Sequence, residues 1–178
     1  MTLPRLALAP ALLLLLLTGC TGLPKGIEPV TGFEQERFLG TWYEIARLDH
    51  RFERGLSQVT AEYSLNDDGS ISVLNRGYSE AEGEWQQVEG RAVFVGDSDV
   101  GHLKVSFFGP FYSSYVVFDL DKEDYSRTYI TGHNRDTLWF LSRTPEVSDE
   151  VQEQFRVRAE VQGFELDELI MVDQSRNQ

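Results

Sequence analysis

Two short sequences that lie far apart in the chain constrain its fold more than any other feature. The first is Gly40-Thr41-Trp42-Tyr43-Glu44, and the second is Leu141-Ser142-Arg143-Thr144-Pro145. Between them, short segments of alternating apolar and polar residues are separated by turn residues. A tryptophan on a first strand and an arginine on a last strand meet only if the sheet between them closes. The guanidinium can then stack on the indole, which is worth about 0.5–2 kcal/mol.

The alternation predicts eight strands joined by short connections. In 58–65, for example, Val59, Ala61 and Tyr63 share one face, and Asn66-Asp67-Asp68-Gly69 then forms a turn. Short connections exclude parallel crossovers, so we predict an all-β fold, an antiparallel up-and-down β-barrel. A barrel of eight strands leaves room for one small ligand. The expected strands are 41–50, 58–65, 71–78, 85–95, 102–108, 113–120, 127–132 and 138–143.

The segments that flank these strands predict helices and one more strand. A helical turn within 33–39 would close one end of the barrel. After Ser148 the apolar residues follow at a spacing of four, which predicts a C-terminal α-helix packed on the barrel wall and ended by Gly163. A short ninth strand is expected at 168–172.

The first twenty residues are typical of an exported lipoprotein. Arg5 precedes the apolar run 6–17, which is shorter than the about 20 residues that a membrane-spanning helix needs. The run ends in Leu17-Thr18-Gly19-Cys20, which resembles a bacterial lipobox. That resemblance implies acylation of Cys20, and Thr21 in place of aspartate implies the outer membrane. An ordinary signal peptide is the alternative. We therefore expect a signal peptide at 1–19, a lipidated tether at 20–32 and one domain at 33–178.

Composition excludes several properties. Cys20 is the only cysteine, so the exported domain has no internal disulfide. The net charge of -13 argues against nucleic acid as a partner and against electrostatic adhesion to anionic lipid. Membrane attachment is therefore expected to come from the acyl chains.

Four longer stretches of sequence include the two opening motifs and occur in a fixed order along the chain. They are 39–47, 49–55, 104–111 and 138–145. Together with the lipobox, they resemble the bacterial outer-membrane members of the lipocalin family, and more distantly its apolipoprotein D-like members. One departure is Leu120-Asp121-Lys122, where only the aspartate of a family motif remains. The resemblance implies storage or transport of fatty acids or lysophospholipids (palmitate is one such chain) in envelope maintenance. It also implies a periplasm-facing anchor in a Gram-negative outer membrane and a possible homodimer.

The inward direction of Arg143 fixes which other side chains line the barrel. Alternation then turns Leu141 and Trp139 inward, and Trp139 lies further from the closed end, as the aromatic wall of a cavity. Asn75 either shares the inward face of Val73 or points outward at a strand end. A Tyr115 hydroxyl inside the barrel needs a partner, which a ligand headgroup could supply. The predicted ligand-binding residues are Trp139, Leu141, Asn75, Val73, Val105, Phe107, Tyr115 and Val117, and the structural signature is Gly40, Trp42 and Arg143.

An aromatic turn at 107–112 has four open interpretations. Its four aromatic residues cannot all face inward, so the turn is the rim of the cavity, a contact with a second copy, a contact with the membrane, or a surface packed on the helix.

No motif of a known catalytic or metal site is present. The three histidines are His50, His102 and His133, and none has a recognisable nucleophile or metal-ligand spacing beside it. We therefore predict no enzyme, no metal and no cofactor, and we expect His50 to be a salt-bridged surface residue near Glu53. Three alternatives are a lipid-modifying enzyme, a structural envelope lipoprotein with a collapsed barrel, and a carrier of a pigment or haem-like ligand.

Overall fold

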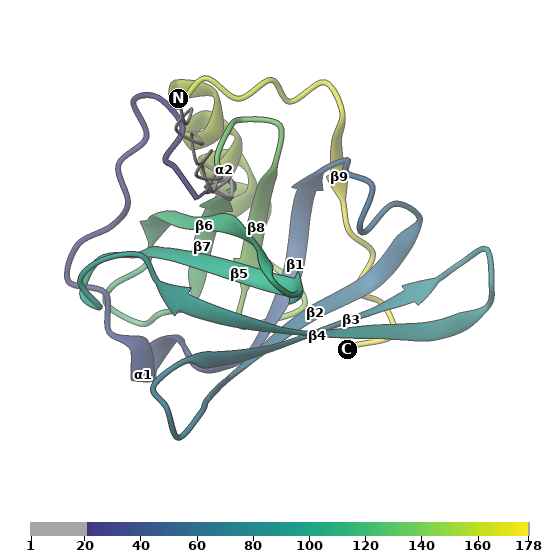
Figure 1. The fold of residues 1–178 in the computed structure, drawn as a ribbon. Helices are drawn as coiled ribbons and strands as arrows, with labels where there is room; N and C mark the ends of the chain where they lie inside the picture. The colour runs from purple at the N-terminus through teal and green to yellow at the C-terminus, as the bar shows by residue number, and fades with distance from the viewer. Residues whose placement is uncertain (1–20, 178) are drawn as a thin grey trace, which may run out of the picture.

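A computed structural model describes residues 21–177, so the predicted signal peptide and Cys20 lie outside the described residues. The predicted barrel is confirmed (Figure 1): nine strands form one antiparallel sheet in the order β2-β3-β4-β5-β6-β7-β8-β1-β9, and β1 also pairs with β2, which closes the sheet. Its elements are α1 (Gln35–Phe38), β1 (Gly40–Leu48), β2 (Leu56–Leu65), β3 (Ile71–Ser79), β4 (Glu84–Phe94), β5 (His102–Phe108), β6 (Phe111–Leu120), β7 (Arg127–Thr131), β8 (Leu138–Ser142), α2 (Asp149–Val161) and β9 (Leu169–Met171).

The up-and-down topology gives the barrel two unlike ends. We call the end with α1 and the connections 66–70, 95–101 and 121–126 the closed end. The other end, with the connections 49–55, 80–83, 109–110 and 132–137, is the mouth. Strand β1 therefore runs from the closed end to the mouth. Within residues 21–177, no helix has the length and apolar character needed to cross a membrane.

Two apolar clusters lie on opposite sides of the barrel wall. On β6, Val117 and Leu120 point into the barrel, whereas Val116 and Phe118 point outward into the cluster under α2. Ser148 caps α2 by accepting a hydrogen bond from the Val151 amide (3.3 Å), and Phe155 is buried against the wall. The predicted helix thus covers one side of the barrel and leaves the mouth free.

The segment 21–32, which we expected to be a tether, is packed along the barrel wall. Ile27 is buried in the cluster under α2, and the Val30 amide donates to the Val117 carbonyl (2.9 Å). Nearer the N-terminus, the Gly22 carbonyl accepts a hydrogen bond from Ser114 Oγ (2.6 Å). The glycines and prolines suggested a free spacer, but two of the apolar side chains between them, Ile27 and Val30, pack against the barrel. The domain boundary at residue 33 stays a prediction.

Candidate ligand-binding site

The closed end is sealed by the predicted tryptophan–arginine stack. The Arg143 guanidinium carbon lies 3.9 Å from the Trp42 ring centroid. Its nitrogens donate to the carbonyls of Arg37, Leu39 and Thr41, each at 2.8 Å. Gly40, where the backbone turns into β1, has a φ of +91°, a conformation that L side chains rarely adopt and that glycine adopts without strain. The stack therefore ties α1 to the ends of β1 and β8.

The predicted lining residues share the interior of the barrel. Leu141, Val73 and Val117 belong to the buried interior cluster, and four others pack against it from the wall: Val105, Phe107, Tyr115 and Trp139. Asn75 follows Val73 by two positions on β3, so it shares that face, and its Oδ1 is buried without a hydrogen-bond partner among the described residues. Sequence parity thus placed these side chains, and their contact with a ligand stays a prediction.

Two tyrosines from opposite walls fill the middle of the barrel. Tyr63 and Tyr115 share a hydrogen bond between their hydroxyls (2.7 Å), so the partner of Tyr115 is Tyr63 and not a headgroup. Burial raises the pKa of both phenols, which keeps both protonated at neutral pH. The cavity that remains beside them is about 10 Å³, the space of roughly one water molecule. Any larger ligand requires these side chains to move.

Above the tyrosines, a buried ion pair lies inside the barrel where the sequence suggested only apolar lining. A bulge at Ile45 lets two charged residues face inward, with Glu44 opposite Leu141 and Arg47 opposite Trp139. Arg47 Nη1 donates to Glu44 Oε1 at 2.7 Å, and both side chains are almost fully buried. Glu44 lies two residues after the inward-facing Trp42, so strand alternation could have predicted its inward direction. Nothing in the sequence marks the bulge that turns Arg47 inward.

The loop 49–55 closes the mouth with the side chain of Glu53. Its Oε2 accepts a hydrogen bond from Trp139 Nε1 (3.1 Å) and lies 3.0 Å from His50 Nε2, within ion-pair distance but outside hydrogen-bond geometry. Arg47 Nη2 holds the loop by donating to the carbonyls of Glu53 (2.9 Å) and Leu56 (3.0 Å). The expectation of a surface His50 was therefore wrong: its side chain is only 9% exposed, because the loop folds it against the Trp139 ring.

The two glutamates at the mouth titrate in opposite directions. Burial, reinforced by the nearby charge of Glu53, raises the pKa of the Glu44 carboxyl well above its usual range, although Arg47 works against the shift. Burial also acts to raise the pKa of Glu53, but contacts with His50, Trp139 and Arg47 outweigh it and lower that pKa. Of the two carboxylates, Glu44 is therefore the one that gains a proton first as pH falls.

The aromatic turn divides between the interior and the solvent. Phe107 packs on the interior cluster, whereas Phe108 and Phe111 are 69% and 66% exposed. Tyr112 lies beside Lys104, whose Nζ is 5.1 Å from the ring centroid. The turn is thus not packed on α2.

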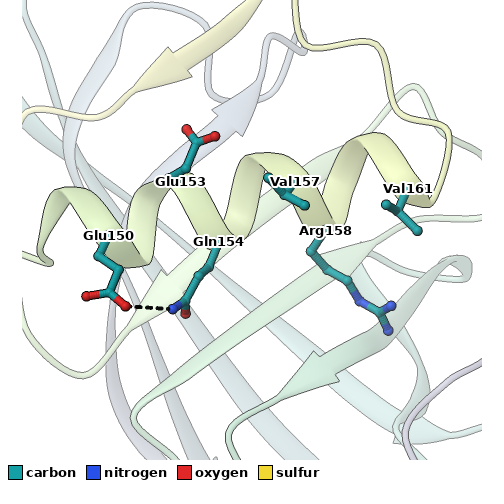
Figure 2. Close-up of a pocket in the computed structure, with 6 residues that line it drawn as sticks. All are labelled: Glu150, Glu153, Gln154, Val157, Arg158 and Val161. Atoms are coloured by element: carbon teal, nitrogen blue, oxygen red, sulfur yellow. Dashed lines mark hydrogen bonds between the residues drawn. The ribbon is translucent and has the colours of Figure 1, made fainter.

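A larger hollow of about 490 Å³ lies on the outer face of α2 (Figure 2). It is open to solvent, and it is lined by Glu150, Glu153, Gln154, Val157, Arg158 and Val161. Arg158 in this hollow is paired with Asp119 (2.8 Å). An apolar ligand there would remain largely in water, so the barrel interior is the better candidate site despite its smaller cavity.

Comparisons with known proteins agree with this geometry. Residues 33–174 match the family model described as a lipocalin-like domain. The chain is 57% identical to the outer membrane lipoprotein Blc of Vibrio cholerae over 89% of this chain and 93% of that protein. It is 50% identical to the protein of the same name from Escherichia coli K12, over 97% of each. Among solved structures, insecticyanin from the tobacco hornworm superposes with a TM-score of 0.69 at 20% identity over 88% of each chain, a likeness of fold alone.

Proposed function

This chain belongs to the lipocalin family, and we propose that it is a lipid-anchored carrier that holds a single-chain lipid, a fatty acid or a lysophospholipid, inside its barrel. Like its outer membrane lipoprotein relatives, it is a protein of the Gram-negative outer membrane. We infer that residues 1–19 are removed, that Cys20 carries the acyl chains, and that the domain faces the periplasm. A homodimer is compatible with this function and is a separate proposal.

One observation carries the proposal: Trp139 stands between the apolar interior and the polar mouth. Toward the closed end the interior cluster is lined by aliphatic and aromatic side chains, and Glu53 and His50 lie on the mouth side of Trp139. The buried Arg47–Glu44 pair is level with Trp139 and Leu141, between the two regions. A single-chain lipid has the same division, an apolar chain and a polar end. Burial of the chain contributes about 0.8 kcal/mol for each methylene, so the chain supplies most of the affinity.

The filled interior defines how such a lipid enters. Glu53 must leave Trp139, and the Tyr63–Tyr115 hydrogen bond must open, before a chain can reach the closed end. Arg47 holds the loop 49–55 on its C-terminal side, through the carbonyls of Glu53 and Leu56. Phe52 in the loop is 68% exposed, so the contact of His50 with Trp139 is the main ring contact that its movement must break. We propose that this loop is the lid of the carrier.

Native mass spectrometry of the protein purified without detergent is the first test. A mass excess that dissociates into single-chain lipids supports the carrier. A clean mass that persists after incubation with lysophospholipid and fatty acid would instead favour a structural envelope lipoprotein. A coloured protein would favour a carrier of another hydrophobic ligand.

Tryptophan emission tests the placement of the ligand on Trp139. Added lysophospholipid or fatty acid should change the emission of the wild type and of Trp85→Phe, because Trp85 stacks under Arg76 and lies outside the interior cluster. The change should be largely lost in Trp139→Phe. A folded Trp139→Phe protein with an unchanged response would contradict this placement.

A further inference from the structure

The tip of the β5–β6 hairpin exposes two aromatic rings to solvent, and the residue beside them is packed in the barrel. Phe108 and Phe111 are each about two-thirds exposed. Beneath them Phe107 packs into the barrel over Gly90, where a Cβ would fall 2.6 Å from the Phe107 ring. Two adjacent exposed phenylalanines on an ordered hairpin indicate a surface that contacts another protein or a membrane.

Charge distinguishes this hairpin from its neighbour at the mouth. Residues 100–118 contain no aspartate or glutamate, although the chain has 29 of them and a net charge of -13. The β3–β4 hairpin, in contrast, carries Glu80, Glu82 and Glu84 at its tip. A layer of anionic headgroups would repel the β3–β4 tip and would not repel the β5–β6 hairpin, where Lys104 supplies a positive charge.

The first described residues, which follow Cys20 in the sequence, lie on the same side of the molecule as this tip. They run beside β6 (Figure 1), where Ser114 Oγ donates to the Gly22 carbonyl, and Arg135 of the mouth connection 132–137 donates to the Lys25 carbonyl (2.8 Å). Ser114 is three residues from Phe111, about 10 Å along a strand. Gly22, the second residue after Cys20 in the sequence, is therefore held against the strand that carries Phe111, near the tip.

From this juxtaposition we propose that the β5–β6 tip, Phe108 to Phe111, is seated in the same membrane leaflet as the acyl chains of Cys20. The inference rests on the proposed lipid anchor. It orients the barrel with one side of the mouth at the bilayer surface and the acidic β3–β4 tip away from it. A single-chain lipid can then pass between the bilayer and the barrel interior without crossing open water.

Site-specific fluorescence on the full lipoprotein tests this orientation. Acylated Cys20 has no free thiol, so Phe108→Cys gives a single site for an environment-sensitive nitrobenzoxadiazole label. The matched controls are Leu65→Cys, which is half exposed at the closed end, and Glu82→Cys on the acidic tip. Each protein is reconstituted in phosphatidylethanolamine–phosphatidylglycerol vesicles with and without doxyl-labelled lipid. We expect doxyl lipid to lower the emission at 108 roughly twofold or more, as for a side chain in the headgroup–acyl boundary, and to leave both controls unchanged.

Each other outcome overturns the proposal in a distinguishable way. A protein that does not float with the vesicles disproves the anchor, and the inference with it. A protein that floats while the label at 108 stays in water leaves the anchor intact and disproves the orientation. A label at 108 that is shifted to the blue but not quenched by doxyl lipid is buried against a second copy, which would make the tip a dimer contact. Phe111→Cys repeats the measurement should Phe108→Cys fail to fold.

Discussion

Each end of the barrel is organised by an arginine, and the two arginines have different partners. Arg143 at the closed end donates to four backbone carbonyls and stacks on Trp42. Arg47 at the mouth donates to two backbone carbonyls and to the carboxylate of Glu44. Carbonyls do not titrate and the indole does not move away, whereas a carboxylate gains protons and the loop above it can lift. We therefore expect the closed end to keep its structure under changes of pH and ligand, and the mouth to be the part that rearranges.

Removal of the tryptophan at the closed end should give the largest loss of stability. Trp42 is fully buried and contacts Phe38, so Trp42→Ala should lower the free energy of unfolding by about 3–5 kcal/mol. Urea denaturation followed by far-UV circular dichroism measures it. Trp85→Ala is the control, because Trp85 is 37% exposed and its stack on Arg76 is worth only about 1 kcal/mol. Equal losses of unfolding free energy in the two variants would contradict the idea that the closed end contributes more to stability.

The two arginines can be compared directly by substitution with methionine. Arg47→Met should cost about 3 kcal/mol at neutral pH, because it leaves buried Glu44 without its counter-ion. Acid should reduce that cost, since a protonated Glu44 no longer needs the arginine. Arg143→Met should cost somewhat less, about 2 kcal/mol, from lost hydrogen bonds and the lost stack, and its cost should not change with pH. The measurement is urea denaturation at pH 4.5 and 7.5, and a pH-independent cost of Arg47→Met would refute the distinction.

The pH dependence of stability isolates Glu44. An unfolded glutamate has a pKa of about 4.3, and the folded value of Glu44 is raised above it. Between the two values the native state keeps a proton that the unfolded chain releases, so stability falls as pH rises through this window. Glu44→Gln removes that loss. Its stability relative to the wild type should therefore increase with pH, by about 1.4 kcal/mol for each unit of pKa shift.

Glu53→Gln is the control for that experiment, and its sign is opposite. The pKa of Glu53 is lowered in the native state, so the contribution of its carboxylate is present above the unfolded pKa and is lost as pH falls through the folded one. Glu53→Gln should therefore lose stability relative to the wild type as pH rises toward the unfolded pKa of about 4.3, and the difference should stay level above it. Two variants that change in the same direction would contradict the opposite titration of the pair.

The sequence predicted the fold well because strand alternation and turn chemistry are local properties. Even the motif that departs from its family works, since Asp121 still accepts hydrogen bonds from Ser126 Oγ and from the amides of Glu123 (3.3 Å) and Asp124 (3.4 Å). The inward parity of Trp139 and Leu141 likewise followed from one assumption about Arg143.

The mouth was less predictable because its arrangement depends on contacts between distant residues. One bulged residue, Ile45, turns Arg47 inward, and a loop that is polar in sequence places Glu53 on Trp139. The partner of Tyr115 lies 52 residues away across the barrel. Alternation alone does not report a bulge, a loop conformation or a pairing across an interior, so the polar half of the site could not be predicted from the sequence.

Asn75 gives the smallest expected change in stability and the sharpest separation of stability from binding. Its Oδ1 is buried without a partner among the described residues, so the folded protein loses the hydration of this atom and regains no hydrogen bond. Asn75→Leu, which has a similar shape, should leave the free energy of unfolding unchanged or raise it by about 1 kcal/mol. If the amide receives a donor from the polar end of a bound lipid, the same substitution should weaken lysophospholipid binding in a titration followed by tryptophan emission. Val73 lies two residues nearer the closed end on the same face. Val73→Ala should lower the free energy of unfolding by about 1–3 kcal/mol through lost apolar burial, and its effect on binding should depend little on the headgroup of the lipid. Higher stability joined to unchanged binding in Asn75→Leu would remove Asn75 from the site and leave the polar end of the ligand to Glu53 and its neighbours.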